Sequence, residues 1–329
     1  MTDQQVRWGV AATGGIAARF AAAMQLVDDG GIVAVASRSQ ERADEFGDAH
    51  GIGVRHGSLA ALADDPDVDA VYVASPHAFH AADAIRFLDA GKHVLCEKPL
   101  ALDEAEAATM VAASRRQGVF LMEAIWSRFL PAYVHLRDLL DQGRIRTPTG
   151  VEASLGFAFP FDPDHRLFDP ELGGGALLDL GIYPIQLCSL VLGPPDEVSG
   201  LGHLGPTGVD ERVAAVLHHA DGGLGVIQAS ITSSLACTAR ITGTGGWIDV
   251  PALMQVPQHV SVTTPAGTEV IDGSFEGEGL RFQVPEVHRC IRAGLVESPV
   301  VPHEETLAMA RTMDRIRAQI GLRYPGETA

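Results

Sequence analysis

The sequence predicts an α/β protein in which a doubly wound parallel sheet comes first and an α+β region with a large, mostly antiparallel sheet follows. Up to residue 122, short β-type runs alternate with helical patterns, as in a parallel sheet covered by helices on both faces. Beyond about residue 150, strands follow one another through turn clusters, as in antiparallel sheets. A chain of 329 residues usually forms more than one core, so we expect domains at 1–122 and 123–329.

The first domain shows five β-type runs separated by helical stretches. The strands are expected at residues 6–12, 32–37, 70–75, 93–97 and 119–122, and the helices at 15–27, 40–50, 79–90 and 103–117. Gly91 and Gly118 stand where helix C-caps are expected. The pattern predicts one parallel sheet.

The second domain shows three hairpin signals. Strands are expected at 214–219 with 224–231, at 238–242 with 247–250, and at 260–264 before a Pro-Ala-Gly turn. The closing helix carries a stripe of apolar side chains at helical spacing, which is typical of core packing: Met309, Met313, Ile316 and Ile320. We expect this helix to pack back on the first domain.

Composition excludes several classes of partner. Hydrophobic residues make up 46% and charged residues 20% of the chain, as in ordinary globular proteins. The formal charge of -18 repels polyanions, so neither nucleic acid nor an anionic membrane is an expected partner. A small phosphate ligand is still compatible, because it needs only a few donors at a helix start.

Redox and targeting signals predict a cytoplasmic protein. The four cysteines form no C-x-x-C pair, which argues against a disulfide framework and against a zinc site. The N-terminus has no signal-peptide core, and no later segment offers about 18 uninterrupted apolar residues.

The first strand runs into a glycine-containing turn. Ala12-Thr13-Gly14-Gly15-Ile16-Ala17 aligns with the dinucleotide-binding pattern G-x-G-x-x-G, with alanine at the first and third glycine positions. A strand before it and a helix after it are the context that a Rossmann domain requires. We therefore expect Thr13, Gly14, Gly15 and Ile16 to contact a dinucleotide; the alternative is a tight turn without a ligand.

The end of the second strand predicts the cofactor. A carboxylate there selects the ribose hydroxyl of NAD, whereas arginine accommodates the 2′-phosphate of NADP. The sequence has Ser37 and Arg38, followed by Arg42, so NADP(H) is the preferred cofactor and NAD(H) the alternative. The two arginines could instead solvate a helix N-terminus, although the helix dipole disfavours cations there.

Several further motifs resemble the Gfo/Idh/MocA family of oxidoreductases. They run through most of the chain: Ser75-Pro76-His77 with His80, Glu97-Lys98-Pro99, and the stretches 122–129, 173–183 and 243–246. The branch that the chain resembles most contains dimeric dihydrodiol dehydrogenase and NADP-dependent D-xylose dehydrogenase. The resemblance implies that Lys98 and Tyr183 flank the nicotinamide and the reacting carbinol. His77 and His80 stand at the carboxyl end of a strand, where open α/β sheets bind ligands, so we expect them to contact the cofactor. We expect the same of their motif neighbours Ser75, Pro76 and Glu97.

These residue types suit alcohol oxidation, in which the cofactor takes a hydride and the protein takes a proton. A free tyrosine has a pKa near ~10, and a neighbouring ammonium such as that of Lys98 would lower it. Asp179 and Tyr183 are four residues apart on a predicted helix and so share a face. We expect Tyr183 to be the general acid/base and Asp179 to accept a substrate hydroxyl; Asp179 could instead be a capping or salt-bridging carboxylate.

Two other pairs of residues have two interpretations. Trp126 and Arg128 follow the fifth strand and are expected to line the substrate pocket, although Trp126 would also suit a domain core. His77 and His80 have a spacing that could hold a metal, but no third ligand is evident, so no metal is expected.

The sequence thus predicts an NADP(H)-dependent dehydrogenase for a secondary alcohol or hemiacetal of a sugar or cyclic trans-diol. A reductase of a dicarbonyl or anhydro-ketose is the alternative among enzymes, and a non-catalytic dinucleotide sensor is the alternative from another class. Apolar residues on both alternations of 224–231 predict a homodimer or higher homo-oligomer through the outer face of the second sheet.

Overall fold

The computed structural model describes residues 5–327. Its contacts divide the chain into two compact units, and each unit is discontinuous in sequence. Of the described residues, unit 1 comprises 5–101, 105–126 and 276–306, and unit 2 comprises 102–104, 127–275 and 307–327. Residues 276–306, which the sequence analysis places in the second domain, thus make their contacts within unit 1.

Unit 1 contains a six-stranded parallel sheet in the order β3-β2-β1-β4-β5-β6, which confirms the predicted Rossmann-type sheet. The strands are β1 (Val6–Ala11), β2 (Gly30–Ala36), β3 (Val54–His56), β4 (Ala70–Val73), β5 (His93–Glu97) and β6 (Leu121–Ala124). The edge strand β3 was not predicted, because three residues that include Arg55 and His56 give no apolar run.

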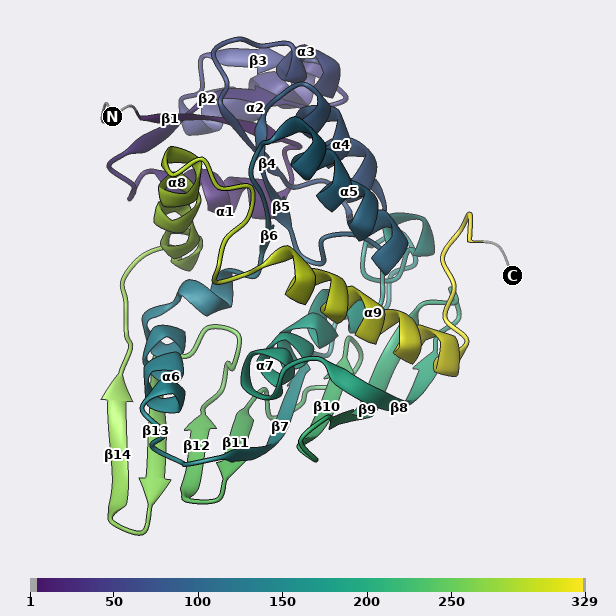
Figure 1. Cartoon of the computed structure of the whole chain (residues 1–329). Coiled ribbons are helices and arrows are strands. Elements are labelled where there is room, and N and C mark those ends of the chain that lie inside the picture. Colours follow the sequence, from purple (N-terminus) through teal and green to yellow (C-terminus); the bar gives the residue numbers. More distant parts are fainter. Residues whose placement is uncertain (1–4, 328–329) are drawn as a thin grey trace. The chain divides into compact units, whose positions relative to one another are not determined.

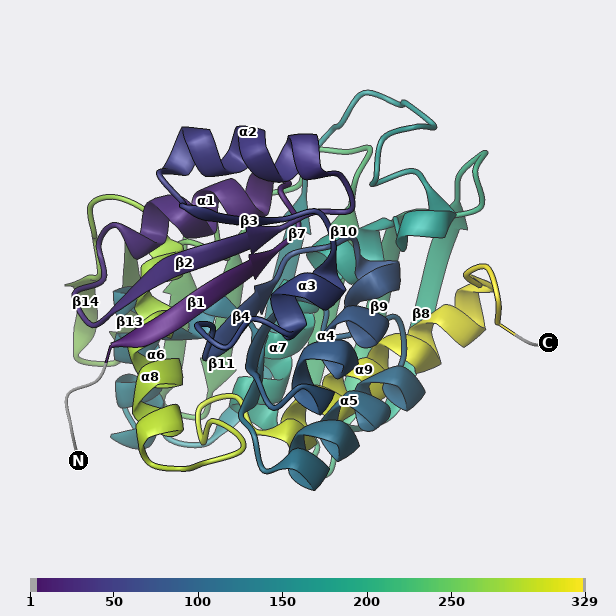
Figure 2. The same ribbon diagram turned by 90° about the horizontal axis from the view of Figure 1, so that it is seen from above.

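Helices cover both faces of this sheet. Helices α1 (Gly15–Met24) and α2 (Gln40–His50) lie on one face, and α3 (Leu59–Ala63), α4 (His80–Asp89) and α5 (Glu104–Gln117) lie on the other (Figure 2). Because both faces are covered, the central strands are apolar throughout; β4 is buried at all four positions.

A late segment completes unit 1. The short helix η5 (Gly279–Gln283) continues into α8 (Val284–Arg292), which contributes the fully buried His288. The indole N–H of Trp8 in β1 donates to Nε2 of His288 at 2.9 Å, and Nδ1 of His288 lies 2.8 Å from Asp29 Oδ1. This bonded chain ties residues that are 280 positions apart in sequence.

Unit 2 is built on an eight-stranded sheet in the order β14-β13-β12-β11-β7-β10-β9-β8. The strands are β7 (Pro148–Gly156), β8 (Pro195–Leu204), β9 (Asp210–His219), β10 (Leu224–Ser230), β11 (Ala239–Gly243), β12 (Gly246–Val250), β13 (His259–Thr264) and β14 (Gly267–Asp272). All neighbours are antiparallel except β7 and β10, so the predicted mostly antiparallel sheet and its three hairpins are confirmed.

The inner face of this sheet packs on the apolar helix α7 (Ile182–Leu192), and α6 (Pro131–Asp141) lies against β13 and β14 (Figure 1). The other helical segments are η2 (Trp126–Phe129), η3 (Pro170–Leu172), η4 (Leu177–Gly181) and α9 (His303–Ile320). Trp126 and the first residues of α9 belong to unit 1. In β9 the side chains alternate, with Val213, Ala215 and Leu217 buried between exposed neighbours.

One helical stretch, Pro170–Leu192, is long and apolar enough by length and composition to cross a membrane. Its apolar character has a structural explanation, since 83% of the qualifying window is buried inside the fold. Burial as a core helix accounts for this composition.

Candidate functional site

The turn after β1 has the features of a phosphate-binding loop. Ala12 has φ +88°, a left-handed conformation for which glycine is better suited and which explains why the usual pattern has glycine there. Gly14 precedes α1 without any side-chain cap, and the first turn of α1 carries no acidic residue. A Cβ added at Gly14 or Gly15 would meet nothing within 4 Å. The first amide groups of α1 are therefore accessible to a pyrophosphate.

The predicted cofactor residues of unit 1 meet at one edge of the sheet. The strands β2, β1, β4 and β5 are neighbours and run parallel, and they end nearly in register: Ala36 pairs with Ala11, Ala11 with Val73, and Val73 with Cys96, the residue before the end of β5. The loops that begin at Ala12, Ser37, Ala74 and Lys98 thus share the carboxyl edge, where open α/β sheets bind their ligands.

Two exposed arginines stand at the end of β2. Ser39 caps α2 by accepting from the Arg42 amide at 3.4 Å, and Ser37 is buried. The guanidinium carbon of Arg38 lies 5.4 Å from the ring centroid of Phe79. Within residues 5–327, neither Arg38 nor Arg42 forms an ion pair with a carboxylate, so both charges are available to an anionic ligand.

The segment Ser75-Pro76-His77 enters a short turn, η1 (His77–Phe79), that leads into α4. His80 is fully buried, and its two ring nitrogens lie 2.8 Å from the carbonyl oxygens of Ser75 and Pro99. Burial lowers the His80 pKa to about 4 against these hydrogen bonds, and the charge of Lys98 adds to the lowering. His80 therefore links the loops after β4 and β5, and its influence on a cofactor would pass through them.

Glu97 and Lys98 end β5, and the peptide bond from Lys98 to Pro99 is cis. Glu97 is buried, and its carboxylate accepts a hydrogen bond from the Tyr72 hydroxyl and one from the Lys98 amide at 3.3 Å. Burial raises the pKa of Glu97, while the bond from Tyr72 and the charge of Lys98 oppose the rise. Lys98 itself is half-buried. The carboxylate of the preceding Glu97 accepts from the Lys98 amide and so helps to hold the backbone of the lysine in place.

In unit 2, a glycine turn leads into the helix that carries Asp179 and Tyr183, both of which are buried. Residues Leu177–Gly181 form a π turn before the α-helix begins at Ile182. The prediction that Asp179 and Tyr183 share a face assumed an α-helical turn, and this wider turn changes the angle between them. Such turns occur frequently at functional sites.

The carboxylate of Asp179 has a cationic partner. Nη1 of Arg166, a half-exposed side chain on the loop before the glycine turn, lies 3.1 Å from Asp179 Oδ1. The salt-bridging interpretation of Asp179 thus has a contact to support it, and it does not conflict with a role as hydroxyl acceptor, because a carboxylate has a second oxygen.

The two residues expected to line a substrate pocket are both buried. Arg128 is fully buried, and its Nε and Nη2 donate to the side-chain and backbone oxygens of Gln186 at 2.9 Å each. Gln186 lies one turn after Tyr183 on α7, so Arg128 supports the helix from inside unit 2. Trp126 is 5% exposed, and the Arg19 guanidinium lies 5.5 Å from its ring centroid within unit 1.

Sequence reasoning missed Phe79, Arg166 and Gln186. Phe79 stands beside the predicted His77 and His80, and an aromatic residue there was the available signal. Arg166 lies in an irregular loop, where periodicity gives no information on contacts. Gln186 looks like an ordinary interior residue of an apolar helix.

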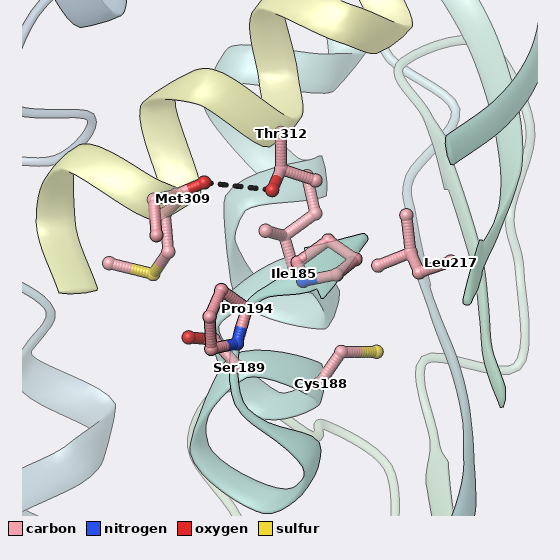
Figure 3. Close-up of a pocket in the computed structure, with 9 residues that line it drawn as sticks. Ile185, Cys188, Ser189, Pro194, Leu217, Met309 and Thr312 are labelled. Carbon is pink, nitrogen blue, oxygen red and sulfur yellow. Dashed lines mark hydrogen bonds between the residues drawn. The ribbon is translucent and has the colours of Figure 1, made fainter. Parts of the chain in front are cut away.

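A cavity of unit 2 lies elsewhere on α7. Its walls come mainly from α7, α9 and the adjoining strands, and Figure 3 shows Ile185, Cys188, Leu217 and Met309 around it. No ionisable residue proposed for catalysis lines it. It is an apolar packing feature of the core. Within residues 5–327, no group of three or more His, Cys, Asp or Glu could hold a metal ion, and all four cysteines are free and buried.

Two family profiles match the chain. Residues 6–125 match the Gfo/Idh/MocA oxidoreductase family with an NAD-binding Rossmann fold, and residues 133–249 match its C-terminal domain. The chain belongs to the Gfo/Idh/MocA family. It is an NAD(P)-dependent dehydrogenase that binds the dinucleotide through its Rossmann domain.

Relatives in this family cover nearly the whole chain. Trans-1,2-dihydrobenzene-1,2-diol dehydrogenase from Mus musculus is 38% identical over 97% of this chain and 98% of its own length. The enzyme of the same name from Xenopus laevis is 37% identical over 97% and 99%. A 3-ketoreductase from Actinomadura kijaniata, solved with NADP and TDP-benzene, is 28% identical and has a TM-score of 0.86 over 96% of this chain and 98% of that one. Levoglucosan dehydrogenase, solved with NADH and levoglucosan, has a TM-score of 0.88 over 97% and 98% at 22% identity, which shows the shared fold alone.

Proposed function

We propose that this family member oxidises a secondary alcohol of a cyclic trans-diol, or of a sugar, with NADP+ as the hydride acceptor. The buried Asp179, held by Arg166 one helical turn before Tyr183, is the observation that carries the proposal. The name of the dihydrodiol dehydrogenases, which match over 97% of this chain, supports the substrate class.

The residues of the chain divide the remaining work. Asp179 accepts a hydrogen bond from the substrate hydroxyl next to the reacting one, and Arg166 holds that carboxylate in its orientation. Tyr183 takes the proton of the reacting hydroxyl and returns it in the reverse direction. Lys98, which the proposal pairs with Tyr183, favours the phenolate. When bound, the dinucleotide would supply the acceptor for the hydride of the carbinol carbon.

NADP(H) is the proposed form of the cofactor. The first amides of α1 would hold the pyrophosphate, and Ser37, Arg38 and Arg42 would hold the 2′-phosphate. The unpaired arginine charges at the end of β2 support this choice over NAD(H), since guanidinium groups bind phosphate strongly.

The reverse reaction is a second candidate direction. The 28% identity with a 3-ketoreductase supports a carbonyl substrate that is reduced by the same groups. A panel of trans-dihydrodiols, aldoses, anhydrosugars and their keto forms, assayed through nicotinamide absorbance with both cofactors, tests the proposal. Turnover of a trans-diol with NADP+ is the expected result. No turnover of any alcohol or carbonyl compound, with NADPH binding intact, would instead establish a sensor.

A further inference from the structure

Two side chains from distant parts of unit 2 hold the turn before the proposed catalytic helix. The Tyr324 hydroxyl donates to the carbonyl oxygen of Gly174 at 2.6 Å. The backbone N–H of Leu177 donates to Oδ2 of Asp210 at 2.7 Å. The bond from Tyr324 therefore holds the glycine turn just before the helix, and the bond to Asp210 holds Leu177, the first residue of the π turn.

The turn has no side chains of its own to define it. Gly173 has φ +73° and Gly175 has φ +120°, both in regions that other residues seldom adopt. A Cβ at Gly175 would lie 2.1 Å from Asp210 Oδ1, so glycine is required for the carboxylate to come this close. The glycine amides donate to the carbonyl oxygens of Pro170, Asp169 and Leu167, so the backbone closes the turn, and side-chain support has to come from other parts of the chain.

Asp210 is an unusual choice for such a contact. It begins β9 and is fully buried, and within residues 5–327 its Oδ1 has no hydrogen-bond partner. Burial raises the pKa of Asp210 to about 7, against the amides of Leu177 and Ala176 and the charge of Arg317. A neutral cap would satisfy the Leu177 amide without the cost of burying a carboxylate.

Tyr324 reaches the turn from the segment after α9. It is 3% exposed, and its ring lies 4.8 Å from the guanidinium carbon of Arg317. Arg317 pairs with Glu327, and Glu327 Oε2 accepts from the Tyr324 amide at 3.2 Å. These contacts fold the segment after α9 back on itself, and the Tyr324 hydroxyl thereby reaches the carbonyl oxygen of Gly174.

We propose that Asp210 and Tyr324 are positioning residues that fix the glycine turn and, through it, the orientation of Asp179 and Tyr183. The inference rests on the proposed function, since it assumes that Asp179 and Tyr183 meet the substrate. Neither positioning residue touches the substrate itself.

The test uses Tyr324→Phe, Asp210→Ala, Asp210→Asn and the double variant Asp210→Ala/Tyr324→Phe in the full chain. Tyr324→Phe and Asp210→Ala should each lower kcat about ten-fold, because small displacements of reacting groups slow the chemical step. KM for NADP+ should stay unchanged in both variants. Asp210→Asn keeps an oxygen for the Leu177 amide and should restore most of kcat. The double variant should lose about as much as one single variant, because both act on one turn.

Thr312→Val is the matched control in the same unit. It removes a buried hydroxyl that donates to the Ala308 carbonyl at 2.8 Å, a bond similar to that of Tyr324 with Gly174, and should lower stability without lowering kcat. Unchanged kcat in Tyr324→Phe overturns the inference even when Asp210→Ala fails to fold. The inference is also overturned if Thr312→Val lowers kcat as much as Tyr324→Phe does.

A parallel Tyr183→Phe variant separates the two levels of the argument. Loss of kcat in Tyr183→Phe with normal kcat in Tyr324→Phe and Asp210→Ala removes only the positioning role. Normal kcat in Tyr183→Phe removes the proposed acid/base function, and the inference with it.

Discussion

The guanidinium of Arg38 lies over the ring of Phe79, with 5.4 Å between the guanidinium carbon and the ring centroid. Arg38 follows β2, and Phe79 ends the turn after β4, so the contact joins two loops at the carboxyl edge of the sheet. A cation over an aromatic face is stabilised by about 0.5–1 kcal/mol at exposed sites. Phe79 thus restricts an otherwise mobile arginine near the place where the 2′-phosphate is proposed to bind.

Removing this arginine should change cofactor selection. Arg38→Ala should raise KM for NADP+ by about 10- to 100-fold, as expected for a lost charge-assisted contact worth about 1.5–3 kcal/mol, and leave KM for NAD+ nearly unchanged. Phe79→Leu should raise KM for NADP+ by about two- to five-fold through the lost cation–π contact. Arg116→Ala, at another exposed arginine of unit 1, is the control. Equal effects of Arg38→Ala on both cofactors would contradict the proposed preference.

The acid/base assignment predicts a loss that is confined to the chemical step. Tyr183→Phe should lower kcat by about 10² to 10⁴, the usual contribution of a positioned acid or base, with NADPH affinity retained. Lys98→Met should lower kcat further and move the remaining activity to higher pH, because the phenolate is no longer favoured. Thermal unfolding checks the alternative that Tyr183 is only a core residue. More than about half of the original kcat in Tyr183→Phe would be incompatible with the role.

The buried carboxylate of Asp210 should make stability depend on pH. Its folded-state pKa of about 7 lies above the ordinary value of 3.8. The protonated carboxyl therefore contributes fully to the free energy of unfolding below pH 3.8, and this contribution is lost as pH rises toward 7. Each pKa unit of difference corresponds to about 1.4 kcal/mol. Asp210→Asn cannot ionise and should therefore gain stability relative to the parent as pH rises from about 4 to about 7. Parallel denaturant titrations across this range measure the gap; a gap that stays constant would show that Asp210 does not titrate there.

The outer face of the unit 2 sheet should hold a homodimer together. Val216 and Val226 pair across β9 and β10 and are 43% and 44% exposed. Leu224 of β10 and Leu201 of β8, the strand that pairs with β9, are also exposed. Contiguous apolar surface of this kind marks association sites. Light scattering should give about twice the 34.7 kDa chain mass, and Val226→Glu should halve it. Leu26→Glu, an exposed leucine of unit 1, should have no effect. A parent mass near one chain would refute the interface.

The sequence indicated those parts of the fold that depend on local pattern. Alternating strands and helices predicted the parallel sheet, and turn clusters predicted the three hairpins, because both signals are contained in short windows. It did not reveal that α8 belongs to unit 1, since the bond from Trp8 to His288 joins residues too distant for any window. The π turn at Asp179 and the burial of Arg128 and His80 also depend on tertiary contacts.

The return of residues 276–306 to unit 1 determines how the chain can be cut or grafted. A fragment that ends at Trp126 would lack α8, and Trp8 would lose the acceptor for its buried indole N–H. A chimera that exchanges unit 2 between relatives must therefore join the two parents near residue 126, near residue 275 and again within α9, and it must also carry over the short segment 102–104. Swapping only the C-terminal half would give each parent's Rossmann domain a foreign helix in its core.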